Sequence, residues 1–252
     1  MLTQIIWLSG SLMTVCLLVR AITDRFYSKY VVFYIYLTHV LLLSCLRYYL
    51  YYFNPGAYRT IYWYTQFLSV AVGYCVIWEI YEQALAAYPG SLRMARQLVL
   101  GIFIVVVAKA LSNSLDGPVW GPAETVLDLE RNLRAVQVFL LLGVLALLRY
   151  YMVPIGRNLR GIVLGYGFFI GALVVSNTLW SQLGDTFQIW LQYFQSMAWL
   201  VTLTIWAATL WNYHPNPTPD ASIAIERDYE WLSARTEQAV AKARGQLMGG
   251  VR

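Results

Sequence analysis

A single cation interrupts an apolar run at residues 101–113, "GIFIVVVAKALSN", in which Lys109 is the one charged residue. An ammonium at membrane depth is costly unless it has a partner or a route to water. It can attach a cofactor, balance a charge in a buried site, or extend along its methylene stem to the lipid surface. The position of Lys109 therefore raises the question of a polar site within the membrane.

Other polar side chains fall in comparable apolar runs, toward the same predicted side of the membrane. Three glutamines at 188, 192 and 195 follow i, i+4 and i+7 spacing and share one helical face. The pattern predicts an outer-half polar chamber that suits a small anionic ligand, although snorkelling cations and amide pairs between helices explain it as well. The candidate ligand-binding residues are Arg47, Gln66, Lys109, Gln137, Asn177, Gln188, Gln192 and Gln195.

Two acids lie near the opposite side, in "WEIYEQ". We expect Glu79 and Glu82 to form inner-face ion pairs with bases such as Arg93 and Arg96. The sequence shows no grouping of His, Cys, Asp or Glu with metal-ligand spacing. His39 is the one histidine at mid-membrane, and a hydrogen bond to a neighbouring hydroxyl or carbonyl explains it better than haem ligation. We therefore expect no catalytic residue, no metal, no cofactor and no enzymatic activity.

Membrane-spanning helices must position these groups. The chain of 252 residues is 59% hydrophobic and 12% charged, against about 25% charged residues in soluble domains. Its net charge of +5 is spread between apolar runs rather than along a stripe, which argues against nucleic-acid binding. A bilayer needs roughly 20 apolar residues per helix. Seven runs meet that length, at about 3–20, 30–53, 61–83, 97–113, 134–152, 161–180 and 187–211.

The basic residues between these spans predict how the chain is oriented in the membrane. Eight follow spans one, three and five, whereas three, Arg59, Arg131 and Arg134, lie in the alternate connections. Because basic loops stay in the cytoplasm, the expectation is an all-α seven-helix bundle over residues 1–213 with its N-terminus outside. Residues 214–252 are expected to form a cytoplasmic Pro-rich linker and an amphipathic helix, with a possible protein partner along 221–247. Glycine pairs at 161/165 and 167/171 predict close helix packing.

The pattern of span three, "YWYTQFLSVAVGYCVIWEIYEQAL", resembles uncharacterised seven-helix proteins of bacterial membranes. This resemblance implies a multi-pass protein of the bacterial inner membrane and transfers no activity. The topology is also similar to that of rhodopsins, but the last span contains no lysine for retinal.

Two functions remain open from the sequence. The first is a receptor-like sensor, in which the outer-half pocket binds a ligand and the C-terminal helix reports it. The alternative is a structural or accessory subunit of a larger membrane complex. A small-solute transporter ranks lower, because the two halves show no matched Gly/Pro interruptions.

Overall fold

The computed structural model describes most of the bundle. Its described residues are 2–86, 88, 90, 92–93, 96–97, 99–105, 108, 122–150, 155–183, 188–214, 230–231 and 234–235. The elements bounded within them are α1 (Leu2–Thr23), the 3-10 helix η1 (Phe26–Ser28), α2 (Val31–Phe53), α3 (Pro55–Ala84), α5 (Pro122–Tyr150), α6 (Arg157–Leu183) and α7 (Gln188–Leu210). No strand occurs in this described part of the chain, so the fold there is all-helical.

Four helices are long and apolar enough to cross a membrane, which indicates a membrane protein. Their candidate spans are Gln4–Thr23, Val31–Phe53, Leu133–Tyr150 and Arg157–Trp180. The remaining helices α3 and α7 have 30 and 23 residues. Helix α3 contains five tyrosines, and α7 contains three tryptophans and three glutamines; the polar atoms of these side chains lower the hydropathy of a segment. Between α3 and α5, residues 99–105 are helical, and Lys109 lies outside the described residues.

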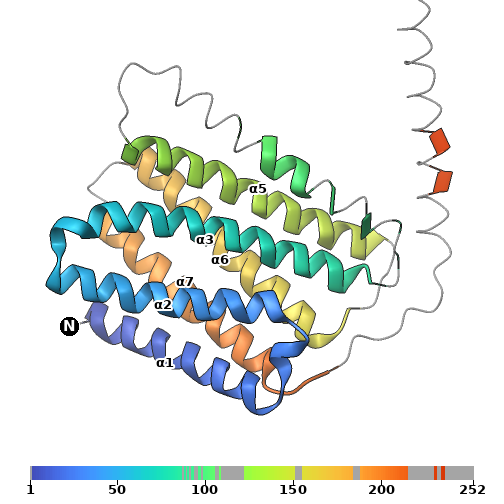
Figure 1. Ribbon diagram of the computed structural model, residues 1–252, viewed down its shortest axis with the longest axis horizontal. Coiled ribbons are helices and arrows are strands. Elements are labelled where there is room, and N and C mark those ends of the chain that lie inside the picture. The colour runs from blue at the N-terminus through green and yellow to red at the C-terminus, as the bar shows by residue number, and fades with distance from the viewer. Residues whose placement is uncertain are drawn as a thin grey trace, which may run out of the picture.

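The helices form a ring that closes on itself. Each of α1, α2, α3, α5, α6 and α7 packs against the next along the chain, and α7 returns to pack against α1. Helix α6 also contacts α3 across the ring. The N-terminus, the α2–α3 connection and the start of α5 lie at one end of the bundle (Figure 1). We call this the N-terminal end and the other the η1 end.

The connection between α2 and α3 is shorter than the segment "NPGAYRT" suggests. Asn54 alone separates the two helices, and its side chain accepts a hydrogen bond from the Ala57 amide at 3.3 Å. Pro55 fits the first turn because its missing N–H is not needed there. The Asn–Pro pair therefore ends one helix and starts the next, and the helix reaches Pro55 instead of beginning near residue 61.

Small residues allow α6 to approach α7 closely. A Cβ at Gly161 would meet the Thr209 side chain, and a Cβ at Gly165 would lie 2.8 Å from Cδ1 of the fully buried Trp206. The prediction of close packing is confirmed for this pair of glycines. It is wrong for the second pair, because Gly171 has no atom within 4 Å of such a Cβ and Gly167 has only Leu141 at 3.9 Å.

An aromatic cluster fills the centre of the ring. Trp206 of α7 meets Phe33 of α2 edge-to-face at 4.9 Å between ring centroids, and Tyr36 meets Tyr166 of α6 in the same way at 5.5 Å. Such edge-to-face contacts are favourable beyond the burial of area. Tyr36 of this cluster also lines the cavity described below.

Candidate functional site

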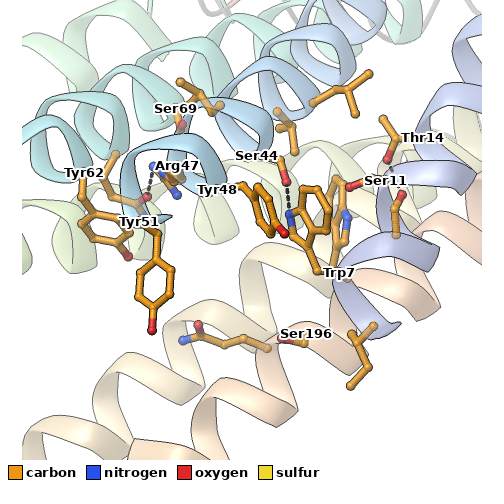
Figure 2. Close-up of a pocket in the computed structure, with 18 of the residues that line it drawn as sticks. Trp7, Ser11, Thr14, Ser44, Arg47, Tyr48, Tyr51, Tyr62, Ser69 and Ser196 are labelled. Carbon is orange, nitrogen blue, oxygen red and sulfur yellow. Dashed lines mark hydrogen bonds between the residues drawn. The ribbon is translucent and has the colours of Figure 1, made fainter. Parts of the chain in front are cut away.

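A cavity of about 570 Å³ opens into the N-terminal half of the ring. Six helices supply its described lining, mainly α1, α2 and α3, with smaller contributions from α5, α6 and α7. Exposed Tyr51 and Tyr52 lie at its open side. The volume lies within the range of small-molecule sites, about 300–1,000 Å³. Figure 2 shows its lining, with Trp7, Ser11 and Thr14 on one wall and Arg47, Tyr51 and Tyr62 on another.

Arg47 of α2 is held in place at this cavity by α3. Its Nη2 donates to Thr65 Oγ1 at 3.0 Å and to Gln66 Oε1 at 2.9 Å, and its guanidinium lies 4.5 Å from the centre of the Tyr62 ring (Figure 2). Hydrogen bonds and ring contact together fix a side chain that otherwise has several rotatable bonds. Arg47 and Gln66, both singled out from the sequence, thus act as one unit.

A second guanidinium lines the cavity, from α5. Arg134 has 6% of its surface exposed and contributes to the cavity wall. The prediction that Arg134 lies in an outer connection is wrong. Helix α5 starts at Pro122, so Arg134 lies three turns inside it. The signal that was available is its spacing from Gln137 by three residues, which puts both on one helical face.

Two charged residues stand among the described residues that line the cavity. Both are arginines, Arg47 and Arg134, and none of the described lining residues is Asp or Glu. Amides at Gln4, Gln66 and Gln195 add polar atoms. Guanidinium groups can form charge-assisted hydrogen bonds with an anionic group.

The remaining predicted ligand residues divide into three groups. Gln195 lines the cavity and donates to Ser176 Oγ at 2.8 Å and to Asn177 Oδ1 at 3.4 Å, so Asn177 supports it from α6. Gln137 is fully buried next to the cavity region and donates to the Val70 carbonyl at 3.0 Å. Gln192 is exposed and does not line the cavity, which corrects its assignment to an inward-facing stripe.

Two predicted residues cannot be placed in this site. Lys109 and the side chain of Gln188 lie outside the described part of the structure. Among the described residues of the polar stripe on α7, Gln195 lines the cavity and Thr202 and Trp206 are completely buried.

At the η1 end, Glu79 has a different role from the expected ion pair. Its carboxylate is buried and accepts the backbone N–H groups of Val32 and Phe33, at 2.9 and 2.8 Å. These amides belong to the first turn of α2, whose own N-cap residue, Tyr30, makes no side-chain cap bond. Glu79 of α3 therefore caps α2 across the helix interface, where a negative charge meets the positive end of the helix dipole.

Glu82, one turn further along α3, does form an ion pair. Arg96 Nη2 lies 2.6 Å from Glu82 Oε1, with both side chains partly exposed, and Arg93 is exposed. Exposed pairs of this kind contribute less than about 1 kcal/mol to stability. His39 is bonded to Ser69 Oγ at 3.2 Å, which confirms the expectation of a hydroxyl partner.

Protein-family models, curated proteins and solved structures were all compared with this chain, and none of them matches it. The function must therefore be argued from the cavity and its surroundings.

Proposed function

We propose that this chain is a receptor-like membrane protein that binds a small organic anion in the cavity at its N-terminal end. The observation that carries the proposal is that Arg47 and Arg134 both line one cavity of about 570 Å³, among mainly aromatic and apolar residues. Concave sites lined mainly by apolar and aromatic groups, with a few convergent polar groups, are typical of ligand pockets.

The cavity faces outward in this proposal. Because Arg134 is buried in the bundle, the basic residues near the outer side are reduced to Arg59 and Arg131, against eight on the other side. This strengthens the charge asymmetry that predicts an outward N-terminus. The seven-span count, with a fourth span at 97–113, and the bacterial inner membrane as the location belong to the same proposal.

In this proposal the protein signals ligand binding on the cytoplasmic side of the membrane. Ligand binding changes a sensor only if the ligand has different affinities for two packing states of the bundle. The C-terminal residues 221–247 are proposed as the reporting helix and as the contact for a protein partner; most of them lie outside the described residues.

Native mass spectrometry of the protein, extracted gently from its own membrane, tests the proposal. We expect the wild-type mass to equal the chain plus one reproducible small molecule. The double variant Arg47→Gln/Arg134→Gln loses this molecule, because both charges that hold its anionic group are removed. Arg149→Gln, an exposed arginine at the far end of α5, serves as the matched control and retains it.

Any of three results would overturn the proposal. The first is a bare wild-type chain, and the second is a bound molecule that survives the double substitution. A stoichiometric protein partner in place of the small molecule would also overturn it, and would support the accessory-subunit function instead.

A further inference from the structure

We infer that the anion bound in this cavity is an aromatic carboxylate, a planar ring system carrying one carboxylate group. The inference rests on the proposed function and adds the chemical class of the ligand. It is carried by the arrangement of aromatic rings between the cavity mouth and Arg47.

Six rings form a continuous wall, which we call the tyrosine wall: Trp7, Tyr48, Tyr52, Tyr51, Tyr58 and Tyr62. Trp7 and Tyr48 stack with their centroids 4.6 Å apart and their planes 14° from parallel. The wall then continues through neighbouring ring pairs whose centroids are 4.7 to 6.0 Å apart. It ends at Arg47, whose guanidinium covers the Tyr62 ring at 4.5 Å.

This wall is built into the site rather than being only an interfacial belt of tyrosines. Trp7 Nε1 donates to Ser44 Oγ at 2.6 Å, which ties α1 to α2 within the cavity (Figure 2). Tyr52 accepts a hydrogen bond from Gln4 Nε2 at 3.0 Å, a second link between the same helices. A belt residue needs no such partners, because its hydroxyl is hydrated at the interface.

A second aromatic surface comes from the other part of the ring. Phe169 of α6 and Trp199 of α7 pack with centroids 4.8 Å apart, and both line the cavity. Nine lining residues are aromatic, against five aliphatic ones (Ile6, Val40, Leu41, Leu43 and Leu173). Flat rings stack favourably on such surfaces in offset or edge-to-face geometry. The walls therefore favour a planar ligand over a flexible acyl chain.

The polar groups of the lining favour a carboxylate. Thr14, Ser69 and Ser196 donate their hydroxyl protons to carbonyls of their own helices, and Ser44 accepts the Trp7 N–H. The charges in the cavity are concentrated at Arg47 and Arg134, whose planar guanidinium groups match a carboxylate.

Isothermal titration of the purified protein in lipid nanodiscs tests the class with three matched probes. They are 2-naphthoate, 2-naphthamide, which lacks the charge, and decahydro-2-naphthoate, which lacks the aromatic rings. Empty nanodiscs correct for partition into lipid. We expect 2-naphthoate to bind at least roughly tenfold more tightly than either analogue, since each analogue loses one of the two interactions.

Variants of cavity residues test whether the charge interaction and the ring stacking both take place in the cavity. Arg134→Gln should weaken the binding of 2-naphthoate by roughly tenfold and leave the affinity for 2-naphthamide unchanged. Trp7→Leu should weaken the binding of both aromatic probes. Arg149→Gln should change neither. Arg47→Gln provides a second charge variant at a half-buried position if Arg134→Gln fails to fold.

The failure of this inference is separable from the failure of the proposed function. Equal binding of decahydro-2-naphthoate and 2-naphthoate, lost in Arg134→Gln, would overturn the aromatic class while the anion site stands. Absence of any arginine-dependent binding would overturn the inference as well, and the native mass spectrum then decides the proposed function.

Discussion

Residues of the same chemical type have different structural roles in this bundle. Glu79 and Glu82 are identical in type and one helical turn apart, yet one caps α2 from inside the interface and the other pairs with Arg96 near the surface. The buried carboxylate satisfies two N–H groups that the helix itself cannot pair. Its contribution to stability should therefore exceed that of its neighbour.

We predict that Glu79→Ala lowers the free energy of unfolding by about 1–3 kcal/mol, because it leaves the amides of Val32 and Phe33 buried without an acceptor. Glu79→Gln should cost less, since one side-chain oxygen remains as an acceptor. Unfolding in mixed micelles by titration with SDS measures both.

The matched control for that series is Glu82→Gln. Its partly exposed ion pair predicts a change of less than about 1 kcal/mol. Equal losses at positions 79 and 82 would contradict the capping role of Glu79.

At the scale of elements, one helix pair sets how tightly the ring closes. Gly161 and Gly165 place α6 directly against Thr209 and Trp206 of α7. Because α7 also packs against α1, the α6–α7 contact determines where the floor and far wall of the cavity lie. At the end of this pair, Asn158 fixes α7 by donating to the carbonyls of Thr209 and Asn212 at 3.1 and 2.9 Å.

We predict that Gly165→Ala destabilises the protein by about 1–3 kcal/mol, because its Cβ would overlap the fully buried Trp206 ring, which has no room to move. The same SDS titration applies. Gly171→Ala on the same helix is the control, since nothing lies within 4 Å of its Cβ. If the two alanine variants were equally stable, Gly165 would not set the helix separation.

At the scale of the whole molecule, the cavity is lined by the start of α1 and the end of α2, and η1 lies at the opposite end of the bundle (Figure 1). Which end faces the outside decides whether the proposed sensor binds an external or an internal ligand. The basic residues near η1, Arg20, Arg25 and Lys29, favour that end as the cytoplasmic one.

Cysteine labelling tests this orientation. In a background with Cys16, Cys45 and Cys75 replaced by serine, we expect a membrane-impermeant maleimide to label Gly56→Cys in intact cells. Ser28→Cys should react only after the membrane is opened. Both positions are exposed, so access to the reagent depends on the membrane alone. The reverse pattern would place the cavity on the cytoplasmic side.

Composition and the length of apolar runs can be taken directly from the sequence. By themselves they determined that this is a helical membrane protein. The Asn54–Pro55 pair also marked the end of α2. The apolar runs also drew attention to Arg47, Gln66 and Gln195, because polar groups in apolar runs are visible in a linear sequence. The sequence predicted helix lengths less accurately, because the first turns of α5 carry charged residues and are nevertheless helical.

The tertiary structure alone decided which of these polar groups meet. Arg134 was misassigned because α5 begins earlier than expected, at Pro122. Gln192 and Glu79 were misassigned because their roles depend on the rotation of α7 and α3 about their axes. Those rotations follow from side chains that touch across helices, such as Gly165 against Trp206. Contacts of this kind join residues far apart in the chain, so a pattern along one segment does not encode them.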